Sequence, residues 1–90
     1  MAKVTFTSAL KRFFPGLKSI EVTGSTVSEV VQTLEKEYPG LTDYILDEGG
    51  SLRQHVNIFV GEELIQDKET LQDQVSPNDE IYILQALSGG

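Results

Sequence analysis

Residues 26–40 read TVSEVVQTLEKEYPG, and no other part of the chain restricts the possible folds as strongly. Apolar side chains recur here with the i, i+3, i+4, i+7 and i+11 spacing that places them on one face of a helix. The members of this stripe are Val27, Val30, Val31, Leu34 and Tyr38. The pattern predicts one amphipathic helix of about three turns.

Both ends of this helix carry sequence signals. At the start, the Thr26 hydroxyl can accept a hydrogen bond from the backbone N–H of Glu29, while the Glu29 side chain can reach back to Thr26. At the end, Pro39 cannot supply the next helical N–H, and its ring disfavours a helical conformation at Tyr38. We therefore expect the helix to follow Thr26 and to finish at Tyr38.

The segment before the helix reads as two strands. Residues 3–7 and 18–22 place apolar side chains two apart, the period of a strand with one buried face. Pro15-Gly16 lies between them and predicts a chain reversal, although residues 9–14 make the connection longer than a tight turn. The expected unit is a loose β-hairpin.

The segment after the helix contains further strands. Beyond a linker, residues 53–60, 64–65 and 80–87 are strand-like, and turns rich in Gly, Pro, Asn and acidic residues separate them. Sheet-forming segments on both sides of one amphipathic helix bury most apolar surface when the helix covers one face of a single sheet. The expected fold class is α+β, with a mixed sheet of four to five strands and one main helix packed on one face.

Composition limits the possible functions. The chain has no cysteine, so it can form no disulfide and can offer no thiolate as a nucleophile or metal ligand. Its 7 basic and 14 acidic residues give a formal charge of −7, which disfavours nucleic acid and anionic membranes and favours a partner with a basic surface. Without an apolar run near 20 residues or a signal-peptide pattern, the expected location is the cytoplasm.

The motifs, taken in order, resemble a known family. Two strands precede a capped helix that ends in Glu-Tyr-Pro-Gly-Leu, and a Val-Asn-Ile-Phe-Val strand, an Asn-Asp-Glu-Ile turn and a terminal Gly-Gly follow. This order resembles the ubiquitin-like sulfur carriers, which include the molybdopterin synthase small subunit, the thiamine sulfur carrier and the cysteine-synthase-linked carrier. The resemblance covers essentially the whole chain. It implies a ubiquitin-like β-grasp domain over residues 1–87 and a flexible tail over residues 88–90.

The resemblance also implies a chemistry. In this family the C-terminal carboxylate attacks the α-phosphate of ATP on a partner enzyme, and a sulfur donor converts the adenylate to a thiocarboxylate. By this resemblance Gly90 is the adenylation and thiocarboxylate site, and Ser88 and Gly89 form the tail that enters the partner. Glycine suits a narrow channel because it has no β-carbon. The implied partners are an ATP-dependent E1-like activating enzyme and a sulfur-accepting synthase.

The same resemblance assigns ATP and metal to the activating enzyme. This chain is then expected to bind no cofactor or metal, to have no catalytic side chain and to act as a carrier instead of an enzyme. Many relatives have a proline two or three residues before the final stretch, which this chain lacks. The molybdopterin, thiamine, cysteine and tRNA pathways all remain open as the destination of the sulfur.

Tail entry requires a docking surface elsewhere on the domain. Immobilising residues 88–90 costs on the order of 3 to 6 kcal/mol of backbone entropy. Burying about 200 Å² of apolar surface would return roughly 5 kcal/mol. Phe59, Tyr82 and Leu84 each alternate with predicted core residues, so we expect them on the face of the sheet opposite the helix, where they form the partner docking site.

Two other functions remain possible. A ubiquitin-like protein modifier would use the same activation but transfer the Gly90 carbonyl to lysines of target proteins. An interaction module would keep the fold and make no use of the tail. A catalytic site on this chain finds little support, because His55 is the single histidine and the adjacent acidic residues lie in turns.

Overall fold

The structure is a computed structural model that describes residues 1–14 and 16–85. The tail residues Ser88, Gly89 and Gly90 lie outside the described residues, as do the last two residues of the strand predicted over 80–87. In chain order the elements are β1 (Ala2–Phe6), α1 (Ser8–Phe13), β2 (Ile20–Val22), α2 (Val27–Glu37), α3 (Thr42–Ile45), β3 (Val56–Val60), β4 (Glu63–Leu64) and β5 (Glu80–Gln85). The predicted succession of two strands, a main helix and further strands is confirmed.

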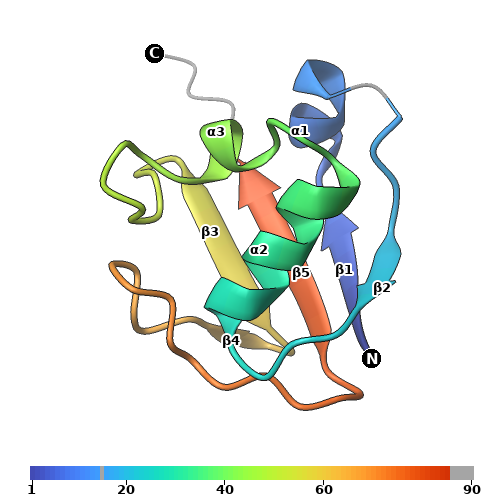
Figure 1. Cartoon of the computed structure of the whole chain (residues 1–90), viewed down its shortest axis with the longest axis vertical. Coiled ribbons are helices and arrows are strands. Elements are labelled where there is room, and N and C mark those ends of the chain that lie inside the picture. Colours follow the sequence, from blue (N-terminus) through green and yellow to red (C-terminus); the bar gives the residue numbers. More distant parts are fainter. Residues whose placement is uncertain (15, 86–90) are drawn as a thin grey trace.

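The strands form one mixed sheet. Its five strands lie in the order β2-β1-β5-β3-β4, so the first and last strands of the chain are neighbours in the centre (Figure 1). β1 pairs with β5 in parallel, whereas the other three pairings are antiparallel. The N-terminal β1–β2 unit is the antiparallel hairpin that the sequence predicts.

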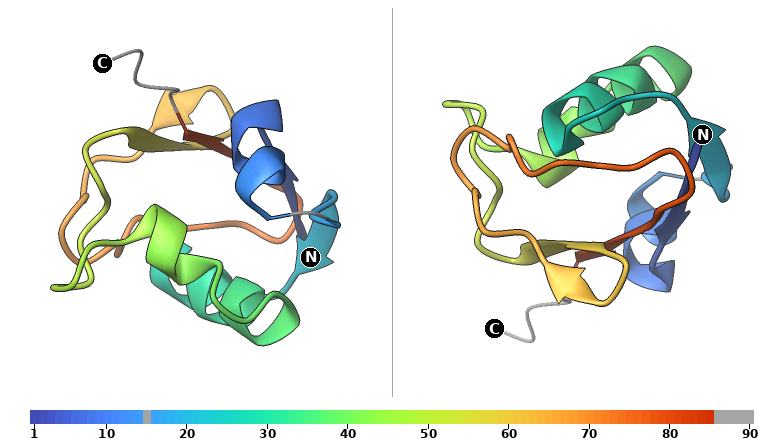
Figure 2. Two further views of the ribbon diagram at one scale, coloured as in Figure 1. Left: turned by 90° about the horizontal axis from the view of Figure 1, so that it is seen from above. Right: turned by 90° about the horizontal axis from the view of Figure 1, so that it is seen from below.

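Helix α2 crosses one face of this sheet (Figure 2). Its buried residues are Val27, Val30, Val31 and Leu34. They join a single apolar core with the sheet residues Val56, Ile58, Ile81 and Ile83, all at most 2% exposed. Because alternate strand residues point to opposite faces, this burial places the intervening residues of β3 and β5 on the side away from α2.

The ends of α2 agree with the sequence signals except in one contact. The Thr26 hydroxyl accepts a hydrogen bond from the Glu29 backbone N–H at 3.2 Å, as predicted. The Glu29 carboxylate, however, accepts from the backbone N–H of Ser25 at 2.8 Å, and not from Thr26. Ser25 offers it a second donor, since the Ser25 hydroxyl also donates to the same Glu29 oxygen at 3.1 Å.

Two short helices occupy segments that the sequence identifies only as a connection and a linker. Residues 9–14 largely belong to α1, which buries Leu10 completely, and the linker after α2 contains α3, which buries Ile45. Helices of 6 and 4 residues are too short to show a helical period in the sequence. The strand predicted over 53–60 begins only at Val56, because the Val56 N–H bonds the Arg53 carbonyl at 3.0 Å and closes a turn there.

Candidate docking face and tail root

The face of the sheet away from α2 carries an apolar patch. Phe59 on β3 lies directly opposite Tyr82 on β5, and Leu84 follows two residues later on the same strand. All three are half-buried, whereas their neighbours Ile58 and Ile83 are fully buried on the other side of the sheet. The structure therefore brings together the three predicted docking residues on one outward face.

Sequence reasoning missed a fourth member of this patch. Leu64 on β4 pairs with Phe59 across the edge of the sheet and is 40% exposed. Its neighbour Ile65 is buried. Consecutive strand residues point to opposite faces of a sheet, and this alternation between Leu64 and Ile65 was the sequence signal that could have identified Leu64 as an outward residue. We call Phe59, Leu64, Tyr82 and Leu84 the docking patch.

Charged groups border the docking patch at the beginning of β5. The Tyr82 hydroxyl donates a hydrogen bond to the Glu80 carboxylate at 2.9 Å. This bond, and then the repulsion that a second negative charge would meet, raise the pKa of Tyr82 above its ordinary value. In the register of the sheet, Lys3 on β1 lies opposite Glu80 on β5 and Glu21 on β2, so ionic side chains of both signs form this border.

The other end of β5 is the root of the tail. Its last residue, Gln85, pairs with Val56 on β3, and its backbone N–H donates to the Thr7 hydroxyl at 3.3 Å. A groove of about 360 Å³, which we call the tail-root groove, opens at this point. Its lining consists of Asp43, Tyr44, Arg53, His55, Val56 and Gln85. Figure 1 places α3, which contributes two of these residues, beside the end of β5.

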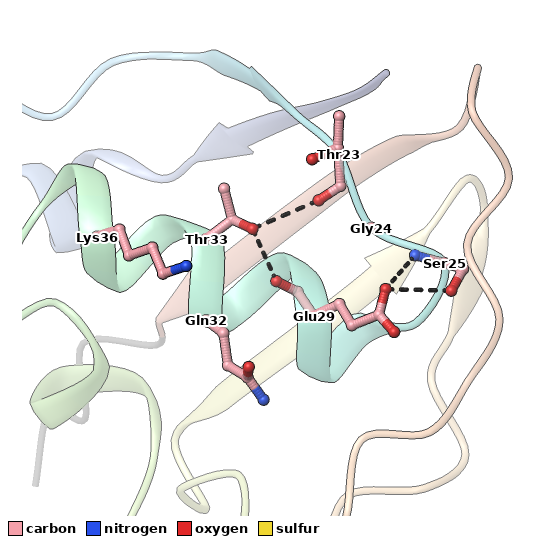
Figure 3. A pocket seen from close by; sticks show the side chains of 7 residues that line it. All are labelled: Thr23, Gly24, Ser25, Glu29, Gln32, Thr33 and Lys36. Carbon is pink, nitrogen blue, oxygen red and sulfur yellow. Dashed lines mark hydrogen bonds between the residues drawn. The ribbon is translucent and has the colours of Figure 1, made fainter.

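A second, polar hollow lies between α2 and the segment that precedes it (Figure 3). The Thr33 hydroxyl bridges the carbonyl oxygens of Glu29 and Thr23, at 3.0 and 3.4 Å. The Glu29 carboxylate is held by Ser25, as described above. These contacts fasten the β2–α2 connection to the helix, so we assign the hollow a structural role.

Two carboxylates with lowered pKa values also have structural roles. Glu35 accepts hydrogen bonds from the backbone N–H groups of Gly40 and Thr42 at 2.8 and 3.0 Å, and these bonds lower its pKa. Hydrogen bonds from the Thr70 hydroxyl and backbone N–H lower the pKa of Asp67 to about 2. Both carboxylates therefore stay ionised at neutral pH while they hold loops in place.

Among residues 1–14 and 16–85, no group of three or more His, Asp or Glu side chains could hold a metal ion. No helix in those ranges is long and apolar enough to cross a bilayer. His55 is exposed just before β3, where it lines the tail-root groove.

Comparison with known families identifies the chain. The model of the ThiS family matches residues 4–90. This chain belongs to the ThiS family. That membership confirms the resemblance to ubiquitin-like sulfur carriers, and the mixed sheet with α2 packed on it is the ubiquitin-like β-grasp that the resemblance implies.

Several proteins resemble this ThiS-family chain along its whole length. The sulfur carrier protein CysO of Mycobacterium tuberculosis is 30% identical over 89 residues, which cover 97% of this chain and 96% of CysO. A chain in the crystal structure of the Amycolatopsis orientalis BexX/CysO complex superposes with a TM-score of 0.85 at 28% identity, with full coverage of both chains. The small archaeal modifier protein 1 of Methanosarcina acetivorans has a TM-score of 0.79 at 28% identity, over 99% of this chain and 95% of its own.

Proposed function

We propose that this ThiS-family chain is a sulfur carrier whose Gly90 carboxylate is adenylated by an ATP-dependent activating enzyme and then converted to a thiocarboxylate. The observation that carries this proposal is the family match, which extends through Gly89 to Gly90. The similarity to the sulfur carrier CysO supports it. The chain lacks cysteine, so the terminal carboxylate is the group on which it would carry the sulfur.

The fold suits a carrier that presents its tail to another protein. Tyr82 and Leu84 of the docking patch lie on β5, the last strand before the tail. From Leu84 to Gly90 there are 90 − 84 = 6 residues, which span up to about 20 Å when extended. A partner that binds the docking patch would therefore hold the reacting carboxylate within about 20 Å of that surface.

In this proposal the chain is a substrate of its partner enzymes and performs no catalysis itself. The activating enzyme supplies ATP and any metal, and a synthase accepts the sulfur in cofactor or cysteine biosynthesis. The similarity to CysO favours cysteine biosynthesis. The Amycolatopsis relative has itself been crystallised as a BexX/CysO complex, which supports the expectation that the chain works with a protein partner.

A second candidate function is supported by a different relative. The similarity to the small archaeal modifier protein 1 of Methanosarcina acetivorans is nearly as extensive as that to CysO. A protein modifier would pass the activated Gly90 carbonyl to a lysine amine instead of to a sulfur donor. Isopeptide-linked adducts in cells, lost on deletion of Gly90, would favour this alternative.

The sulfur-carrier proposal is tested by intact-protein mass spectrometry. After incubation with the activating enzyme, ATP and a sulfide source, the chain should gain the mass expected for exchange of one oxygen for sulfur. Deletion of Gly90 moves the carboxylate back by up to about 3.5 Å, whereas attack needs reacting atoms within roughly 3 to 3.5 Å. The shortened chain should therefore fold normally and gain no sulfur.

A substitution in the tail provides an independent test with a matched control. Gly89→Val should also abolish thiolation, because a β-branched side chain would clash with a channel shaped for glycine. Gly49→Val adds the same side chain in an exposed turn, where the new Cβ would meet Asp47 Oδ1 at an ordinary 3.5 Å, and should leave thiolation unchanged. Wild-type thiolation rates in both tail variants would refute the proposal.

A further inference from the structure

Strand β2 forms one edge of the sheet. Within the residues that the structure describes, it pairs with β1 on one side and with no strand on the other (Figure 1). We propose that β2 accepts an extended, acidic segment of a partner protein, which adds to the sheet as a further strand. This contact does not involve the tail or the docking patch, so the inference goes beyond the proposed function.

The hydrogen bonds of β1 determine which backbone groups of β2 face outward. The Lys3 N–H donates at 3.1 Å to the carbonyl of Asp79, the residue before β5, so Lys3 directs its backbone groups toward β5. Lys3 lies opposite Glu21 on β2. In an antiparallel pair, opposite residues either exchange both hydrogen bonds or direct their backbone groups away from each other. Glu21 therefore directs its N–H and its C=O to the open edge, where an added strand could bind both.

Hollows on both sides of β2 leave room for the side chains of an added strand. One hollow, of about 420 Å³, is lined by Lys3, Ser19, Ile20 and Glu21. The other is the polar hollow of about 530 Å³ described above, which begins at Thr23, directly after β2, and extends along α2 to Lys36 (Figure 3). Since alternate side chains of a strand point to opposite faces, an added strand would direct one set toward each hollow.

Lysine side chains around this edge favour an acidic occupant. Lys3, Lys18 and Lys36 are all exposed, so three of the seven basic residues of the chain lie close to a strand of only 3 residues. Lys36 lines the polar hollow but takes no part in the contacts that fasten it. Of the two acids in the linings, Glu29 already accepts hydrogen bonds from Ser25.

The same charges argue against a second copy of this chain as the occupant. Another copy would bring a further formal charge of −7. It would also present its own lysines to those of the first copy. A foreign segment with acidic side chains instead complements the lysines and still supplies the N–H and C=O groups that Glu21 requires.

The β2 edge is separate from the docking patch. In the sheet order, β1 and β5 lie between β2 and β3, and β4 forms the opposite edge. A strand added to β2 would extend the sheet outward and leave Phe59 and Leu64 uncovered. A protein bound at β2 would therefore leave the docking patch free for another partner.

Hydrogen exchange of single amides, followed by NMR in the full chain, tests the proposal. In the free chain the Glu21 N–H should exchange rapidly and the Val22 N–H slowly, because only the latter is directed toward β1. The probe is a synthetic peptide in which valine alternates with aspartate. At saturation it should slow exchange of the Glu21 N–H at least about tenfold and leave the amides of β4, the other edge strand, unchanged. The same peptide with lysine in place of aspartate should have no effect.

Variants of the chain test the backbone and the charge separately. Glu21→Pro removes the outward N–H at an edge position that tolerates proline, so it should abolish peptide binding and leave the melting temperature close to that of the wild type. Lys36→Glu should weaken peptide binding at least about fivefold. Lys68→Glu makes the same change in charge at an exposed position outside both linings and should leave the affinity unchanged.

Three results would each overturn the inference. The first is unchanged exchange of the Glu21 N–H at saturating aspartate peptide. The second is equal protection by the lysine peptide, and the third is equal weakening by Lys36→Glu and Lys68→Glu, since either would show that the lysines beside β2 do not select the occupant. If Glu21→Pro fails to fold, the exchange data and the two lysine variants still decide the outcome.

Discussion

Serine substitutions at Ile58 and Phe59 should separate folding from docking, because these neighbours on β3 face opposite sides of the sheet. Ile58 is fully buried under α2, whereas Phe59 is half-exposed on the docking patch. Loss of a buried Ile side chain costs about 2–5 kcal/mol, and a buried unpaired hydroxyl adds about 1–3 kcal/mol. A domain of 90 residues has a total stability of roughly 5–13 kcal/mol. Ile58→Ser should therefore remove a large part of the stability of the domain and lower its melting temperature strongly.

The outer face should respond in the opposite way. The double variant Phe59→Ser and Leu84→Ser leaves the buried core intact, so its melting curve should stay close to that of the wild type. Its affinity for the activating enzyme should fall at least tenfold, or about 1.4 kcal/mol, because two apolar contacts at the centre of the interface are lost. Thermal melts followed by circular dichroism and titration calorimetry would measure the two effects. Strong destabilisation with unchanged affinity would refute the assignment of these residues to docking.

Two further predictions concern the stability of the domain. Val31→Asp would bury an unpaired carboxylate at a position that is 2% exposed, so cooperative unfolding should be lost or strongly weakened; a melting temperature within a few degrees of wild type would show that the helix face is misassigned. Glu35 should make stability depend on pH, since its pKa is lowered by folding: its contribution is fully present above the ordinary value of 4.5 and is lost as the pH falls through the lower folded value. Melting temperatures of the wild type and Glu35→Gln should thus differ at pH 7 and converge in acid, and a constant difference would contradict this role.

Local patterns in the sequence were sufficient for the main elements of the fold. The stripe along α2, the Thr26 cap and the alternation in β3 and β5 each depend on residues close together in the chain, and the structure contains all of them. The same alternation placed Phe59, Tyr82 and Leu84 on one outward face. The reason is physical: helix and strand periods determine which side chains share a face before any long-range contact forms.

Features that depend on distant residues were decided by the tertiary structure. α1 and α3 are too short to form alone, and they exist because Leu10 and Ile45 complete a core built from the rest of the chain. Leu64 joins the docking patch only through pairing of β4 with β3. The tail-root groove likewise brings Asp43, Arg53 and Gln85 together from α3, the turn before β3 and the end of β5, a proximity that no local periodicity encodes.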